Sequence, residues 1–73
     1  MKETIKHRFD MTLKNCRAYE ELGLRNTLLN EIGVLRGIYY CMEIEGIDPG
    51  NQEEFLHFIE VQQSMRDTFP RGK

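Results

Sequence analysis

The chain contains no tryptophan, only two prolines, only two cysteines and no long apolar run. A membrane-spanning helix needs about 18 to 20 consecutive apolar residues, and Arg25, Glu31 and Arg36 interrupt the longest candidate. No stretch alternates apolar and polar residues on either side of a turn dipeptide, as a β-hairpin does. With 30% charged and 40% apolar residues, the sequence is typical of an all-α protein in water and not of a disordered chain.

The two cysteines and the short length bear on how the fold is held together. Cys16 and Cys41 form no C-x-x-C pair and no signal-peptide pattern precedes them, so we expect free thiols in a reducing compartment, the cytoplasm. A chain of 73 residues has a marginal core, burying only about 60–65% of the surface that its unfolded form exposes. We therefore expect self-association, with a homodimer as the first possibility.

Hydrophobic periodicity predicts three helices in a single domain over residues 1–69. The predicted helices cover about 3–22, 26–45 and 52–68, and a flexible tail follows over 70–73. Short connections favour antiparallel neighbours, so we predict a three-helix antiparallel bundle with the second helix in the middle. The alternative is a helical hairpin whose N-terminal helix splays away to pair with a second copy.

Residues typical of helix ends set these bounds. Gly23 and Gly46 are expected to end the first two helices in the left-handed conformation, and Asn26 or Thr27 is expected to cap the second. Two starts are open for the third helix. One has Asp48 as the cap with a proline at the first helical position, and the other has Asn51 as the cap.

The segment from Leu24 to Ile44 has two apolar stripes where an ordinary surface helix has one. The first stripe is a packing seam of Leu28, Ile32, Leu35, Tyr39 and Met42. The second, about a third of a turn away, consists of Leu29, Gly33, Gly37, Tyr40 and Ile44. A helix that is apolar on two sides has neighbours on two sides, so this second stripe is the candidate interface.

The other two helices each have one apolar face. On the first helix it consists of Ile5, Phe9, Thr12, Leu13, Cys16 and Tyr19. On the third it consists of Phe55, Phe58, Ile59, Gln62, Met65 and Phe69, and Pro70 is expected to end the helix.

Inside a helix, Gly33 and Gly37 each lower the stability by about 0.5–1 kcal/mol relative to alanine. Close approach of another helix would offset this cost. That helix could be either of the other two in the same chain or one from another copy, and a helix break at the glycines is a third alternative. For Tyr40 the alternatives are an interface residue and a tyrosine at the core edge, with its ring covered and its hydroxyl in solvent.

We predict no cofactor and no metal site. Glu54-x-x-His57 matches one element of a di-metal bundle, with Glu31 as a conceivable further ligand, but the helical wheel places His57 away from the core. A zinc site would need Cys16, Cys41, His7 and His57. Their separations follow no known ligand pattern, and both cysteines lie on helix faces that look packed.

The charge distribution favours protein partners over nucleic acid. Residues 1–18 contain five basic and two acidic residues, whereas residues 19–63 contain nine acidic residues and two arginines. The acidic part would repel phosphate, so DNA binding would have to use the basic N-terminal helix in a dimer.

The sequence has no nucleophile with a base at useful spacing and no phosphate-binding loop, so we do not expect an enzyme. We predict a small helical protein-interaction module that acts as a regulator, adaptor or inhibitor of a larger, unidentified protein. Small helical chains of this type are common among accessory proteins of bacteria and phages. The alternatives are a DNA-associated regulator and a binder of a small ligand or metal with its site between subunits.

Overall fold

The computed structural model describes the backbone of residues 2–68 and the side chains of residues 4–65. This part of the chain forms three α-helices, α1 (Lys2–Leu22), α2 (Arg25–Glu45) and α3 (Gln52–Thr68), and no strand. The predicted bounds agree with these within one residue. In residues 2–68 we find no helix with the length and apolar content needed to cross a membrane.

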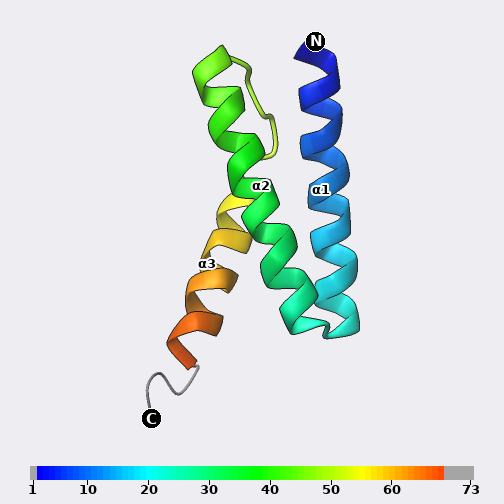
Figure 1. Cartoon of the computed structure of the whole chain (residues 1–73), viewed down its shortest axis with the longest axis vertical. Coiled ribbons are helices and arrows are strands. Elements are labelled where there is room, and N and C mark those ends of the chain that lie inside the picture. The colour runs from blue at the N-terminus through cyan, green and yellow to red at the C-terminus, as the bar shows by residue number, and fades with distance from the viewer. Residues whose placement is uncertain (1, 69–73) are drawn as a thin grey trace.

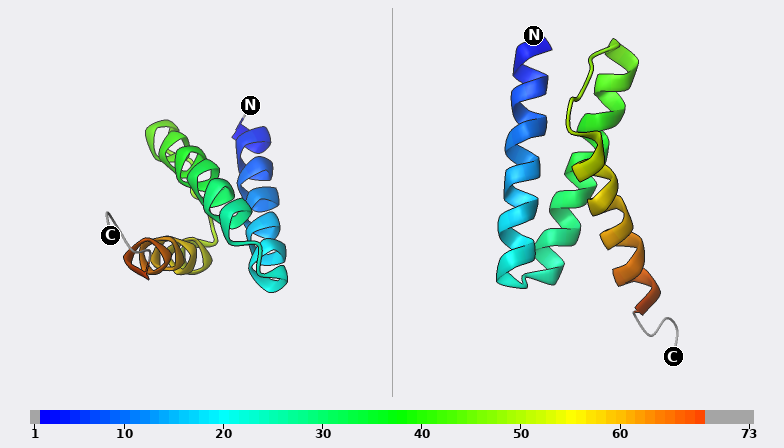
Figure 2. Two further views of the ribbon diagram at one scale, coloured as in Figure 1. Left: turned by 60° about the horizontal axis from the view of Figure 1, so that its bottom comes forward. Right: turned by 180° about the vertical axis from the view of Figure 1, so that it is seen from behind.

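The helices form the predicted bundle, with α2 in contact with both neighbours. α1 and α2 lie side by side and antiparallel, joined by a tight turn (Figure 1). After α2 the chain runs back along it, so that α3 begins beside the middle of α2 and runs in the opposite direction (Figures 1 and 2). Because α1 packs on α2, the alternative with a splayed N-terminal helix is wrong.

The core lies where the three predicted apolar faces meet. Its buried apolar residues are Phe9, Leu13, Cys16, Leu28, Ile32, Leu35, Met42, Phe55 and Phe58. The other residues predicted for the inner faces of α1 and α2 are also buried or half-buried, and so are Ile59, Gln62 and Met65 of α3. The predictions for Phe69, Pro70 and the tail fall outside the described residues.

Three aromatic rings fix the place of α3 on the hairpin of α1 and α2. The rings of Tyr39 and Phe55 are stacked, with centroids 4.0 Å apart, and Phe9 lies 6.1 Å from each of them. The Tyr39 hydroxyl accepts a hydrogen bond of 3.1 Å from Gln52 Nε2 at the start of α3. One residue from each helix therefore meets at this point.

Glycine ends both α1 and α2 as predicted. Gly23 and Gly46 have φ angles of 73° and 74°, and residues with a Cβ atom rarely adopt such positive values. The N–H of Leu24 donates to the carbonyl of Tyr19 over 3.0 Å, and the N–H of Ile47 donates to Met42 over 2.8 Å. This is the Schellman pattern, which satisfies carbonyls that the helix leaves without partners.

The predicted N-cap of α2 is wrong. The cap is Leu24, which makes no side-chain capping bond, in place of Asn26 or Thr27. The physical reason is the tightness of the turn. The Leu24 carbonyl already accepts the first helical hydrogen bond, from Leu28 over 2.8 Å, so the helix begins before either polar residue is reached.

Of the two predicted starts for α3, the structure has the later one. The helix begins at Gln52, and the carbonyl of Asn51 accepts a hydrogen bond of 3.1 Å from the Phe55 N–H. Asp48 has a different role, because its Oδ1 accepts a hydrogen bond of 3.1 Å from the Gly50 N–H. This local bond closes the turn before the helix starts.

Candidate protein-binding face

The second apolar stripe of α2 lies on the surface. α1 and α3 both contact the seam side of α2, and no ribbon of the described residues covers its other side (Figure 2). Tyr40 is 64% exposed and Ile44 is 66% exposed, while Leu29 is half-buried. We call this surface the outer face of α2; it consists of Asn26, Leu29, Asn30, Gly33, Val34, Gly37, Tyr40, Cys41 and Ile44.

Neither α1 nor α3 approaches the two glycines of this face. A Cβ atom built on Gly33 or Gly37 would have no described atom within 4 Å, apart from its own helix backbone and chain neighbours. The alternative of a close helix contact within the chain is therefore wrong. α2 also continues through both glycines, so a helix break there is wrong as well. The physical reason is that the seam residues, on the other side of α2, already take both neighbouring helices.

Tyr40 is also not a core-edge residue with a covered ring, because most of its surface is in solvent. Tyr39, one residue earlier, is half-buried and stacked on Phe55. The step of about 100° per helical residue separates them. The sequence correctly assigned the two tyrosines to different faces but overestimated how much of Tyr40 is covered.

The outer face of α2 has no charged residue. The five charged residues of the helix are Arg25, Glu31, Arg36, Glu43 and Glu45. At about 100° per residue, all five lie outside an arc of about 140° that runs from Leu29 to Val34. The arc follows the helix from Asn26 to Ile44, a length of about 27 Å. An ordinary surface helix has its charges on this side.

Grooves flank the face on both sides. The groove towards α1 has a volume of about 400 Å³ and is lined by Ile5, Arg8, Val34, Gly37, Ile38 and Cys41. The groove towards α3 has about 290 Å³, with Tyr40 on one wall and Leu56 and Ile59 on the other. Leu56 is itself 57% exposed. Apolar surface thus continues from the outer face into both grooves, with Arg8 lining the first groove and Arg36 and Glu43 lining the second.

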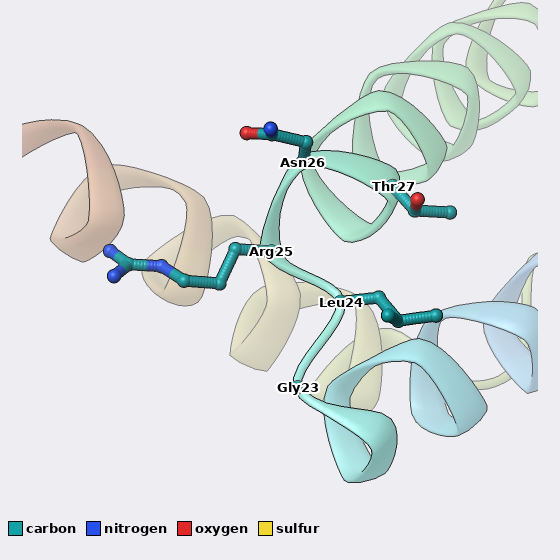
Figure 3. A pocket seen from close by; sticks show the side chains of 5 residues that line it. All are labelled: Gly23, Leu24, Arg25, Asn26 and Thr27. Atoms are coloured by element: carbon teal, nitrogen blue, oxygen red, sulfur yellow. The ribbon is translucent and has the colours of Figure 1, made fainter.

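Another hollow lies at the turn between α1 and α2. It has about 530 Å³ and is lined by five consecutive residues, Gly23 to Thr27. The side chains of Leu24 and Arg25 point to different sides of the turn (Figure 3). The lining contains no acid, histidine or cysteine, so it has neither a nucleophile with its base nor a set of metal ligands.

The residues that match one element of a di-metal bundle have separate partners. Glu54 forms an ion pair with Arg17 of α1, and this hydrogen-bonded carboxylate raises the pKa of the Arg17 guanidinium. His57 Nε2 lies 3.1 Å from Glu20 Oε2, and Glu31 accepts a hydrogen bond of 3.2 Å from Asn15. His57 is exposed, as the helical wheel predicted.

The contacts of Arg17 with Glu54 and of Glu20 with His57 form a polar seam between α1 and α3 that sequence reasoning missed. Arg17 and Glu20 are three residues apart, as are Glu54 and His57, so the two pairs match once the helices are in register. The equal spacing of these two pairs of polar residues could have suggested the contacts, but the sequence does not give the register of the two helices.

The two cysteines considered as zinc ligands lie in different environments. Cys16 is buried in the core, whereas Cys41 is exposed, so the expectation that both cysteines are packed is wrong for Cys41. Burial raises the pKa of the Cys16 thiol from 9.0 to about 12, with Glu31, Glu20 and Glu54 adding to the effect. A zinc ligand or a nucleophile must be a thiolate, and burial keeps this thiol protonated. Over the described residues there is no group of three or more His, Cys, Asp or Glu that could hold a metal.

Two basic residues of α1 are paired with acids. Lys6 Nζ lies 2.9 Å from Asp10 Oδ1, one turn along the same helix, and Arg17 pairs with Glu54. Paired cations have less to gain from a phosphate, because the existing pair must be broken first.

Comparison with family models, curated proteins and solved structures finds no match for this chain.

Proposed function

We propose that this chain is a protein-interaction module that binds its partner through the outer face of α2. It acts by occupying a surface of a larger protein, as a regulator, adaptor or inhibitor, and not by catalysis. The observation that carries the proposal is the uncharged, exposed arc of α2, which follows the helix from Asn26 to Ile44.

The residue types of this face support a protein partner. The centre of a protein interface is typically depleted of charge and enriched in aromatic residues. Here Tyr40 combines a large exposed ring with a hydroxyl that can stay in contact with water. The arc is about 27 Å long and one helix of about 10 Å wide, an area just below the roughly 300–600 Å² of the largest apolar patch of a typical monomer.

The same residue types argue against nucleic acid at this face. Phosphate binding needs lysine and arginine, and the arc has neither. The alternative function as a DNA-associated regulator would have to use α1, where Lys6 and Arg17 have acidic partners.

Capture from a native lysate of the source cells tests the proposal, with a charge placed on the face. The Tyr40→Glu variant should lose a partner that the unmodified chain retains, because a buried carboxylate without a counter-charge is costly. The matched control is Met11→Glu, which adds the same charge at an exposed apolar position of α1. Circular dichroism checks that all three chains are equally helical. Equal capture by both variants would contradict the proposal.

A further inference from the structure

We propose that the occupant of the outer face of α2 is a second copy of this chain, packed antiparallel about a two-fold axis near Gly37. This inference rests on the proposed function, because it takes the face to be a protein-binding surface. A larger target that uses the same face would then have to displace the second copy.

The distribution of large and small residues along α2 favours an antiparallel arrangement. The two largest exposed side chains of the face, Tyr40 and Ile44, lie in its C-terminal half, whereas the N-terminal half has Gly33 and, on the edge towards α1, the smaller Val34. In an antiparallel pair centred on Gly37, residues equally far before and after this glycine lie at the same height. Tyr40, three residues after Gly37, then lies within about 2 Å of the height of Gly33 of the other copy, four residues before it, and Gly33 has no side chain to obstruct the ring.

A parallel arrangement would place each residue at the height of the same residue in the other copy. Tyr40 would be level with Tyr40 of the second copy, and Gly33 level with Gly33. The bulky pair would hold the helices apart at one end and leave a gap at the glycines. Close packing without voids therefore requires the antiparallel arrangement.

The charges at the edge of the face lead to the same orientation. Arg25, Arg36 and Glu43 all lie on the edge towards α3, within about 20° of one another on the wheel. In the antiparallel pair, Glu43 of one copy lies between the heights of Arg25 and Arg36 of the other. In a parallel pair this edge would instead lie opposite the edge towards α1 of the other copy, where Val34 and Cys41 offer no charge to pair with.

The glycine at the centre gives the first test. Gly37 has open space around it within one chain, so Gly37→Leu should leave the single chain folded. In the dimer a leucine there would force the helices apart and raise the dissociation constant about tenfold or more. Ala18→Leu, at an exposed position of α1, is the matched control and should leave it unchanged. Sedimentation equilibrium measures both variants against the 8.7 kDa of the monomer.

The exposed thiol of Cys41 gives the second test, which reports the orientation. In the antiparallel pair the two Cys41 residues are about 12 Å apart along the axis, too far for a disulfide. Position 34 of one copy lies within about 2 Å of the height of Cys41 of the other, on the same edge. Mild oxidation of Val34→Cys should therefore give a covalent dimer that joins position 34 to Cys41. The unmodified chain should stay uncrosslinked.

The outcomes separate this inference from the proposed function. A dimer that Gly37→Leu dissociates, and that cross-links only in Val34→Cys, supports the antiparallel pair. A monomeric unmodified chain, a dimer insensitive to Gly37→Leu, or a dimer linked through two Cys41 residues would overturn it. A monomer that still loses a larger partner in Tyr40→Glu would leave the proposed function standing. If the chain forms the antiparallel dimer but Tyr40→Glu does not affect its capture of a larger partner, the second copy is supported and the proposed function is contradicted.

Discussion

Leu35 should carry a large part of the stability of this small domain. Its side chain is fully buried in the middle of the α2 seam. Truncating such a leucine to alanine costs about 2–5 kcal/mol, from lost burial and the cavity left behind. A chain of 73 residues has a total stability of only about 4–11 kcal/mol. Leu35→Ala should therefore lower the thermal midpoint by at least about 8 °C and could unfold the chain altogether.

The matched control is Leu22→Ala, which removes the same atoms from a side chain that is 69% exposed. It should cost no more than about 0.5 kcal/mol and move the midpoint by less than about 4 °C. Thermal unfolding followed by circular dichroism measures both variants at one protein concentration. Equal shifts in the two variants would show that the seam of α2 is wrongly assigned.

Three further outcomes are expected. Phe58→Ala removes a fully buried ring of α3 and should cost about 3–5 kcal/mol of stability. Hydrogen exchange should show that the amides of α3 lose protection before those of α1 and α2. Equal loss in all three helices would contradict this order and would mean that the domain unfolds as a single cooperative unit. A thiol reagent at neutral pH should modify the exposed Cys41 but reach the buried Cys16 only after unfolding, and rapid labelling of both cysteines would contradict the packing of α1. Folding raises the pKa of Cys16 from 9.0 to about 12, so the unfolded chain loses the thiol proton at a lower pH than the folded chain does. The contribution of this thiol to stability should therefore be intact below pH 9 and fall between about pH 9 and 12. If stability depended on pH in the same way in Cys16→Ala, this assignment would be contradicted.

The sequence alone determined the secondary structure and the inward faces of the helices. Apolar residues that recur every three or four positions must share one side of a helix, which is why Phe9, Leu13, Ile32 and Leu35 could be assigned to the core from their spacing. Gly23 and Gly46 could be assigned to helix ends because a left-handed residue there strongly favours glycine. These are local properties of the chain, so they need no knowledge of which helix packs on which.

Only the tertiary structure decided which apolar stripe of α2 is covered. Both stripes have the helical period, so periodicity cannot tell a buried stripe from an exposed one. α1 and α3 both pack on the seam of Leu35, which leaves Gly37 and Tyr40 in solvent. The tight turn likewise made Leu24 the cap of α2. Contacts between residues far apart in sequence, such as Arg17 with Glu54, depend on the register of two helices, which no local pattern specifies.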